Sequence, residues 1–163
     1  MPTLTKRILG IDPGYDRVGV AVLEKQSRQE VVLFSDCLLA GAKLEFAERL
    51  VTIGNQVEKI IKKWQPDILA IEKLFFAANQ KTAMRVAETR GMIIYLGQKH
   101  SLRVREFTPL QVKMSVSGYG RADKKQVTEM VCRLIKMEKK PRYDDEYDAV
   151  AVALTCLAHG RFQ

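Results

Sequence analysis

Two apolar runs that each end in a carboxylate constrain this chain more than any other feature. The run ILGI leads into Asp12, which precedes the turn-forming residues Pro13 and Gly14, and the run ILAI leads directly into Glu72. Such runs predict buried strands, and two strands that both end in an acid can hold their carboxylates side by side. Hard cations such as Mg²⁺ take oxygen ligands, commonly one or two carboxylates with phosphate and water. The pattern therefore predicts a sheet that carries a metal site at one edge.

Apolar periodicity along the rest of the chain predicts strands first and then helices that alternate with strands. The predicted strands are RILGI, VGVAVLE and VVLFSDC, joined by hairpins, and two further runs at 68–71 and 104–107. The predicted helices cover 44–65, 81–99, a short stretch opened by Thr108 and Pro109, 124–136 and 145–159. This order predicts an α/β fold, a mixed five-stranded sheet flanked by helices. A chain of 163 residues fits one domain, so we expect a single domain over 1–163.

Gly91 lies inside the predicted helix 81–99. A glycine in a helix interior costs about 1 kcal/mol relative to alanine. We therefore expect Gly91 to allow a close approach of another piece of backbone.

The chain carries a surplus of positive charge. It has 27 Lys and Arg against 19 Asp and Glu, a net charge of +8. A basic balance is typical of proteins with a polyanionic partner, although many basic proteins bind nothing acidic. The sequence contains no G-x-x-x-x-G-K-[ST] loop, which argues against an energy-driven motor.

The cysteines and the apolar runs predict a cytoplasmic protein. Cys37, Cys132 and Cys156 are an odd number and widely spaced, which argues against a disulfide framework and against a zinc site. We expect them to be core thiols in a reducing compartment. The first residues lack a signal-peptide pattern, and no apolar run approaches the roughly 20 residues of a membrane span.

A third acidic segment, DDEYDAVAVAL, opens the last predicted helix. Asp145 and Asp148 are three residues apart and so share one helix face, while the following Ala and Val residues pack against the sheet. Acids in a first helical turn also stabilise the helix dipole, and for this segment alone capping outweighs catalysis. We expect Asp144 and Glu146 to be solvated residues of that kind. For Asp12 alone the alternative is an ordinary Asp-Pro-Gly turn.

Taken together, the ordered segments ILGIDPG, LAIEK and DDEYDAVA resemble the RuvC family of RNase H-like nucleases. The segments EKLFFAANQ, ETRG, TPLQVKMSVSG and RADKKQV resemble the same family in the same order, so the resemblance spans almost the whole chain. It implies an RNase H-like fold and an endonuclease that resolves Holliday junctions by metal-dependent phosphodiester hydrolysis.

The resemblance also implies which acids act. It carries Asp12, Glu72, Asp145 and Asp148 over as the catalytic residues and as the ligands of two Mg²⁺ ions, with Mn²⁺ as a possible substitute. The chemistry also calls for two ions, because one activates the attacking water and the other neutralises the leaving oxygen. Asp144 leaves open which acids of its cluster face the metals.

Several further residues are candidates for contact with DNA. By resemblance Phe75 contacts a base, as apolar wedges do in DNA-kinking proteins, whereas Phe76 packs; the alternative is that both rings are core. The resemblance places Lys113 and Lys124 near the scissile phosphate. Other candidate phosphate contacts are Arg121, Lys125, Arg85 and Arg90, and the alternative for each is a solvated basic face. We assign no role to His100 or His159.

The family resemblance implies partners as well. It implies a homodimer that nicks two strands of a four-way DNA junction, with RuvA and RuvB as branch-migration partners. A YqgF-like nuclease of the same fold and a non-catalytic junction-binding protein stay open as alternatives. Actin-like ATP-binding proteins also begin with a strand and an Asp-x-Gly turn, but they need a second domain that 163 residues cannot supply.

Overall fold

The structure is a computed structural model that describes residues 6–27, 29–74, 80–137 and 140–160. Its strands are β1 (Arg7–Asp12), β2 (Arg17–Gln26), β3 (Gln29–Leu39), β4 (Ile68–Glu72) and β5 (Arg103–Phe107). Its helices are α1 (Phe46–Trp64), α2 (Gln80–Lys99), α3 (Pro109–Ser117), α4 (Lys124–Leu134) and α5 (Asp144–Ala158). Every predicted element is present, with bounds that differ by a few residues.

The strands form one mixed sheet in the order β3-β2-β1-β4-β5. The hairpin strands pair antiparallel, β1 with β2 and β2 with β3, whereas β4 pairs parallel to both β1 and β5. The prediction of a mixed five-stranded sheet is therefore confirmed. Because β1 and β4 run parallel in the register Ile11 to Ile71, their last residues end at the same edge of the sheet.

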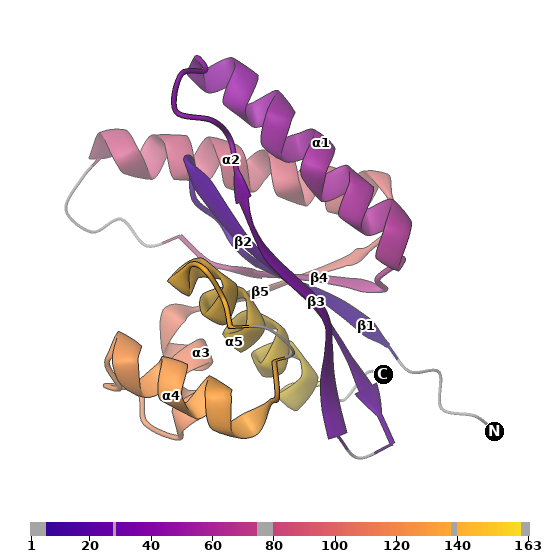
Figure 1. Cartoon of the computed structure of the whole chain (residues 1–163), viewed down its shortest axis with the longest axis vertical. Helices are drawn as coiled ribbons and strands as arrows, with labels where there is room; N and C mark the ends of the chain where they lie inside the picture. Colours follow the sequence, from indigo (N-terminus) through magenta and orange to yellow (C-terminus); the bar gives the residue numbers. More distant parts are fainter. Residues whose placement is uncertain (1–5, 28, 75–79, 138–139, 161–163) are drawn as a thin grey trace.

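Helices cover both faces of the sheet (Figure 1). Helices α1 and α2 lie over one face, and α5, with α3 and α4 outside it, lies over the other. The alternation of side chains along β1 feeds both layers, since Ile8 belongs to the core under α5 while Leu9 and Ile11 belong to the core under α1.

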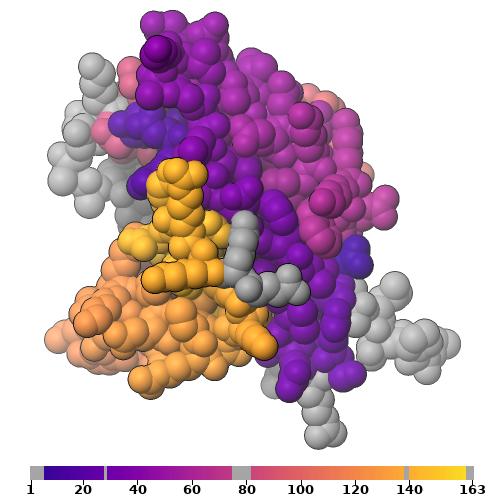
Figure 2. Space-filling model, in the orientation of Figure 1, coloured from indigo at the N-terminus to yellow at the C-terminus, as the bar shows by residue number. Residues whose placement is uncertain are grey.

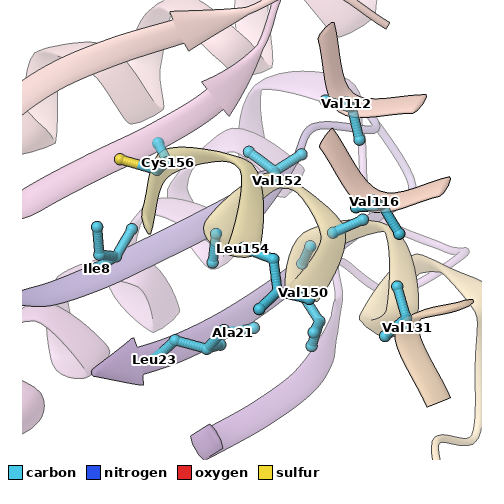
Figure 3. Packing of buried hydrophobic residues seen from close by; sticks show 14 of the residues in the cluster. Ile8, Ala21, Leu23, Val112, Val116, Val131, Val150, Val152, Leu154 and Cys156 are labelled. Carbon is cyan, nitrogen blue, oxygen red and sulfur yellow. The ribbon is translucent and has the colours of Figure 1, made fainter. Parts of the chain in front are cut away.

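Helix α5 packs directly on the sheet, and Figure 3 shows buried side chains of the helix and of the strands gathered there. Val150, Val152 and Cys156 are buried there with Ile8 and Ala21. A Cβ atom at Gly10 would lie 2.3 Å from the carbonyl oxygen of Ala149, and one at Gly19 would lie 1.9 Å from that of Asp145. Two strand glycines thus let helix backbone rest on strand backbone.

The expectation for Gly91 is wrong. A Cβ atom at Gly91 would meet nothing within 4 Å, and Gly91 lies on an exposed face of α2 with Met84 and Tyr95. The close approaches on this layer are instead made by Gly97, whose added Cβ would lie 2.7 Å from Leu69 Cδ2, and by Gly54 beside Met92.

The capping predictions for α3 are confirmed. The Thr108 side chain accepts a hydrogen bond from the Gln111 backbone N–H, and the Gln111 side chain accepts one from the Thr108 N–H. Pro109 opens the helix, and Gly118 ends it with a left-handed φ of 70°.

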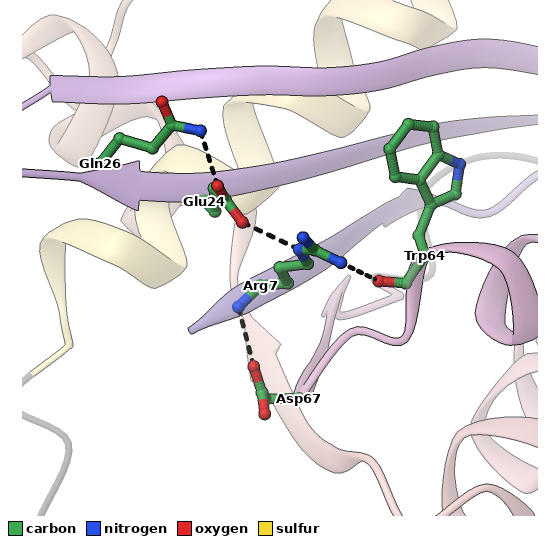
Figure 4. A network of polar contacts seen from close by, with 5 residues as sticks. All are labelled: Arg7, Glu24, Gln26, Trp64 and Asp67. Atoms are coloured by element: carbon green, nitrogen blue, oxygen red, sulfur yellow. Dashed lines mark hydrogen bonds and ion pairs between the residues drawn. The ribbon is translucent and has the colours of Figure 1, made fainter. Parts of the chain in front are cut away.

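A polar network ties together the sheet end that lies opposite Asp12 (Figure 4). The Arg7 side chain donates hydrogen bonds to Glu24 at 2.8 Å and to the Trp64 carbonyl at 2.9 Å, and the Arg7 backbone N–H donates to Asp67 at 2.8 Å. The hydrogen bonds from Arg7 and Gln26 lower the pKa of Glu24. Strands β1 and β2 and the connection from α1 to β4 are thereby joined.

The cysteine prediction is confirmed in part. All three cysteines are free, and Cys37 and Cys156 are buried as expected. Cys132 is exposed, because the short helix α4 turns this residue away from its buried face of Val127 and Val131. Within the described ranges, no helix is both long and apolar enough to cross a membrane.

Candidate active site

Four acids from three elements face one another at one edge of the sheet. Asp12 is the last residue of β1 and Glu72 the last of β4, so the parallel pairing brings their carboxylates together. Asp145 and Asp148 lie in the first turns of α5, which crosses β1 and β2. The carboxylate of Asp12 is close enough to interact electrostatically with the other three. The structure thus brings the four predicted acids together.

Burial and mutual repulsion disfavour the charged forms of these acids. Burial, together with the charges of Asp148, Glu72 and Asp145, raises the pKa of Asp12 to about 7. Burial, with the charge of Asp148, likewise raises the pKa of Glu72 to about 7. Burial also raises the pKa of Asp148, against the lowering effect of Lys124. The cluster therefore carries a free-energy cost that a bound cation relieves.

Basic side chains flank the acids on two sides. The Lys124 ammonium lies 3.2 Å from Asp148 Oδ2 and 4.0 Å from Asp144 Oδ2. Burial acts against the charge on Lys124, but these carboxylates together raise its pKa. On the other side, the Arg17 guanidinium lies 3.6 Å from Asp145 Oδ2 and 5.1 Å from the centre of the Tyr143 ring.

The donor chemistry of the cluster fits a hard divalent cation. Four carboxylates supply oxygen ligands, and the raised pKa values of Asp12, Glu72 and Asp148 reflect burial with too little countercharge nearby. In the described part of the chain, no three Asp, Glu, His or Cys side chains are gathered closely enough to hold one metal ion. Lys124 and Arg17 engage two of the carboxylates in this arrangement. A metal would therefore have to draw the acids inward and release these two pairs.

Glu146 is not the solvated residue that the sequence predicts. Its side chain is 2% exposed, accepts a hydrogen bond from the Ser35 hydroxyl at 3.0 Å and accepts another from the Arg142 backbone N–H at 3.2 Å. The carboxylate thus ties the first turn of α5 to β3 and to the segment before the helix. Asp144, by contrast, has a side chain that is 73% exposed, as expected.

Arg90 has a role that differs from a contact with phosphate. Its Nε donates a hydrogen bond to the Glu72 carbonyl at 3.0 Å, and its guanidinium pairs with Glu106. Arg90 therefore fixes the backbone at the end of β4, at the residue that carries the Glu72 carboxylate. Arg85 stacks over the rings of Tyr15 and Phe46, at 5.8 and 5.4 Å from their centres.

The other candidate DNA contacts lie around the acids or outside the described residues. Lys113 on α3 is close enough to Glu72 to lower its pKa, and Lys124 contacts Asp148 directly. Arg121 is exposed between α3 and α4, and Lys125 is exposed with its ammonium 4.0 Å from Glu129. Phe75 and Phe76 fall outside the described residues. Figure 2 shows that the C-terminal part of the chain, with α4 and α5 in orange and yellow, packs against the violet hairpin strands.

Comparisons with known proteins agree with this geometry. A family described as crossover junction endodeoxyribonuclease RuvC matches residues 8–156. A crossover junction endodeoxyribonuclease RuvC of Halothermothrix orenii is 44% identical over 94% of this chain and 91% of its own length. A protein of the same description from Thermosipho melanesiensis is 42% identical over 96% of this chain and 99% of its own.

Solved structures extend the likeness to three dimensions. T. thermophilus RuvC, solved in complex with a Holliday junction substrate, superposes with a TM-score of 0.87 at 27% identity and covers 96% of this chain and 95% of that one. The yeast mitochondrial Holliday junction resolvase Ydc2 shares the fold, with a TM-score of 0.71 at 14% identity over 94% of this chain and 78% of its own.

The mixed sheet with acids at its edge and α5 across it defines an RNase H-like nuclease. The descriptions of the relatives narrow that class to enzymes that hydrolyse DNA at crossover junctions. The chain belongs to the crossover junction endodeoxyribonuclease RuvC family.

Proposed function

We propose that this chain resolves Holliday junctions, cutting phosphodiester bonds of four-way DNA in recombination and repair. The observation that carries the proposal is the convergence of Asp12, Glu72, Asp145 and Asp148 from β1, β4 and α5. A buried group of acids with raised pKa values is typical of a catalytic site rather than of helix capping. The family of the chain and its likeness to a RuvC solved with a Holliday junction support the choice of substrate.

The four acids are the residues that would hold the metal. We assign them to two Mg²⁺ ions, with Mn²⁺ as a substitute. When bound, two such ions activate a water for attack and neutralise the leaving oxygen. Asp12, which has carboxylate neighbours on both β4 and α5, lies at the centre of this donor set. Lys124 would then be released from Asp148 and, with Lys113 near Glu72, would be available to contact phosphate.

The remaining assignments concern DNA handling and partners. We assign phosphate contacts to Lys113, Arg121, Lys124 and Lys125, and base contact to Phe75. We further propose a homodimer that nicks two strands and works in the cytoplasm with RuvA and RuvB. The exposed α2 face that carries Met84, Gly91 and Tyr95 offers a surface for the second copy.

The test of this function is nicking of a synthetic four-way junction in Mg²⁺. Wild-type protein should nick the junction, and Asp12→Asn should bind it without nicking, because the substitution removes a metal ligand but leaves the basic surface. Mg²⁺ should also raise the melting temperature of the wild type, since a ligand that binds the folded state stabilises it, and should raise that of Asp12→Asn less.

The alternatives give different results in the same assay. A YqgF-like nuclease would cut another nucleic acid in preference to the junction. A non-catalytic junction-binding protein would bind without nicking in wild type and variant alike. Wild-type nicking rates in Asp12→Asn would remove Asp12 from the site.

A further inference from the structure

A hollow of about 710 Å³ opens beside the acids, and its lining includes Asp145 but not Lys124. The turn between β1 and β2, the end of β3, and the starts of α1, α2 and α5 all line it. Asp145 belongs both to its wall and to the acid cluster. The hollow is therefore continuous with the place where a phosphodiester would be cut. Its volume falls within the range of sites that bind small organic groups.

The charges in the wall of the hollow cancel. Arg17 pairs with Asp145, and Arg49 pairs with Asp16. While Arg17 is paired with Asp145, two cations and two anions balance, so most of the wall offers no surplus charge; a metal ion on Asp145 would free Arg17 beside one phosphate. The Arg49 guanidinium also donates a hydrogen bond to the Ala42 carbonyl at 3.1 Å, so it is held by the loop.

The rest of the wall suits an uncharged planar group. Leu39, Ala42 and Val86 supply apolar surface, and Tyr15 supplies an aromatic ring. Arg85 stacks over that ring at 5.8 Å and over Phe46 at 5.4 Å, which holds the ring in place. A nucleobase is planar, largely uncharged and able to stack on such a ring.

The two flanks of the acid cluster differ in chemistry. On the flank of Asp148 and Glu72 lie the cations Lys124 and Lys113, which suit the phosphates of a DNA strand. On the flank of Asp145 lies the neutral hollow. A strand cut at the acids must leave the site on both sides, so its next nucleotide on the second side reaches the hollow.

We infer that the hollow is a subsite for an unpaired nucleotide of the cut strand, whose base stacks on Tyr15. The inference rests on the proposed function. The crossing point of a four-way junction is where a base is most easily unpaired, and the energy of taking a base out of a stack is least when it is already unpaired. Because unpaired bases occur where strands cross, such a subsite would favour cutting at the crossing point. It would do so without hydrogen bonds to the edge of a particular base.

The experiment first maps the nick made by wild type and then modifies the nucleotides on each side of it. 2-Aminopurine at each position reports base stacking by its fluorescence. The complexes are made with three non-cutting proteins: Asp12→Asn alone, Asp12→Asn with Tyr15→Phe, and Asp12→Asn with Tyr15→Ala. A second set of junctions carries an abasic site at the same positions. Ala42→Trp fills the hollow, and Val51→Trp adds the same ring at an exposed position of α1 outside the hollow.

One nucleotide beside the nick should show quenched 2-aminopurine emission in the complex, and Tyr15→Ala but not Tyr15→Phe should abolish the quenching. Loss of one stacked base corresponds to a fall in affinity of roughly 5- to 150-fold. An abasic site at that nucleotide should cost wild type a similar factor, and the two losses should not add, because they remove the same contact. In an otherwise wild-type chain, Ala42→Trp should slow nicking at least about tenfold, with Val51→Trp unchanged.

Equal affinity and nicking rate in Ala42→Trp and Val51→Trp would overturn the subsite, as would additive losses from Tyr15→Ala and the abasic site. Thermal melting identifies any variant that fails to fold, and if Tyr15→Ala does so, the two tryptophan variants decide. Wild-type nicking of the junction with no sensitive nucleotide would remove the subsite and leave the proposed function standing. Absence of nicking by wild type would remove both.

Discussion

Asp12 illustrates how the site stores free energy in a single side chain. Its carboxyl group is buried beside three other acids, and its pKa of about 7 lies far above the ordinary value of 3.8. Folding thus brings the acid into a place that disfavours its charge. The same is true of Glu72, whose pKa is also raised to about 7.

The raised pKa of Asp12 predicts how stability depends on pH without metal. Between about pH 4 and pH 7 the folded protein holds a proton on Asp12 that the unfolded chain releases, so the free energy of unfolding falls as pH rises through this window. Asp12→Asn has no carboxyl group at this position, so its free energy of unfolding should not fall for this reason as pH rises. At pH 8 in a chelator, Asp12→Asn should be more stable than wild type by on the order of 1 to 4 kcal/mol, since each pKa unit corresponds to about 1.4 kcal/mol.

Denaturant unfolding at pH 4, 6 and 8 measures the effect. The difference between the two proteins should be small at pH 4 and grow toward pH 8. Asp144→Asn is the control, because that side chain is largely exposed and its substitution should change little at any pH. A variant Asp12→Asn that gains no stability at pH 8 would contradict the buried, repelled carboxyl.

Glu146 predicts a second effect of a single residue. Glu146→Ala leaves the buried Ser35 hydroxyl and the partly buried Arg142 backbone N–H without their acceptor. Unsatisfied buried groups cost about 1 to 3 kcal/mol each, so we expect a loss of about 2 to 4 kcal/mol in the free energy of unfolding. Glu146→Gln keeps one side-chain oxygen as an acceptor and should lose less.

Because Glu146 anchors the turn that carries Asp145, the alanine variant should also need more Mg²⁺ for half-maximal nicking per folded molecule. Urea unfolding and a Mg²⁺ titration of nicking measure the two effects separately. An unchanged Mg²⁺ requirement would limit Glu146 to stability.

At the scale of elements, the position of α5 decides the geometry of the site. Helix α5 brings two of the four acids, and it lies on β1 and β2 at the two glycines Gly10 and Gly19. The contact at Gly19 is with the backbone of Asp145 itself, whereas the contact at Gly10 is with Ala149 and Ala153, further along the helix.

These two glycines predict a matched pair of variants. Gly10→Ala and Gly19→Ala each force a methyl group against helix backbone, and overpacking of this kind costs about 1 to 3 kcal/mol or more. Both should lower the melting temperature. Gly19→Ala should reduce nicking per folded molecule far more than Gly10→Ala, because it displaces Asp145 from the acids of β1 and β4. Equal nicking by the two variants would separate the helix position from catalysis.

The elements themselves were predictable because each has a local cause. Pro66 follows the end of α1, Thr108 and Pro109 open α3, and the apolar runs at 8–11 and 68–71 fill the sheet. Gly91 was misread because a glycine shows where a close approach is possible but not which surface makes it; within the chain, Gly10 and Gly97 make such contacts instead.

At the scale of the whole molecule, positive charge is unevenly placed around the acids. Lys113, Arg121, Lys124 and Lys125 lie on or between α3 and α4, the elements that extend beyond α5 (Figure 1). A protein that neutralises phosphates releases counterions, so its affinity for DNA falls as salt rises, with a log-log slope of about −0.9 per phosphate contact.

This distribution predicts the salt dependence of junction binding. Lys113→Ala or Lys124→Ala should each reduce the magnitude of the slope by roughly one unit if each lysine makes one phosphate contact, as we propose. Lys25→Ala is the control, since Lys25 is exposed near the far end of β2, where β1 begins rather than where it ends. Junction affinity over a salt series without divalent metal measures the slopes. Equal slopes in all four proteins would show that Lys113 and Lys124 are ordinary solvated residues that make no phosphate contact.

The role of a site residue could be predicted where the local sequence pattern determines it. It could not be predicted where contacts with distant parts of the chain determine it. Asp12 and Glu72 end parallel strands, and Asp145 and Asp148 share a helix face, so the pattern gives two pairs, which the resemblance to the RuvC family joins into one set. Glu146 looks like its acidic neighbours in the sequence, but it is buried by Ser35, which is 111 residues away. Arg17 and Arg90 were missed or misread for the same reason, because their partners Asp145 and Glu106 lie on other elements.

Because α5 packs on Gly10 and Gly19 and comes last in the chain, the site can be completed only late in synthesis. The ribosome delivers β1 and β4, with Asp12 and Glu72, well before it delivers α5. Until α5 emerges, the two glycine-bearing strands lack their cover and half of the acids are missing. A nascent chain at that stage would carry only two of the four proposed metal ligands, so we expect it to bind no catalytic metal pair and to leave DNA uncut. On this proposal, the ability to cut DNA would appear only when α5 packs on the sheet.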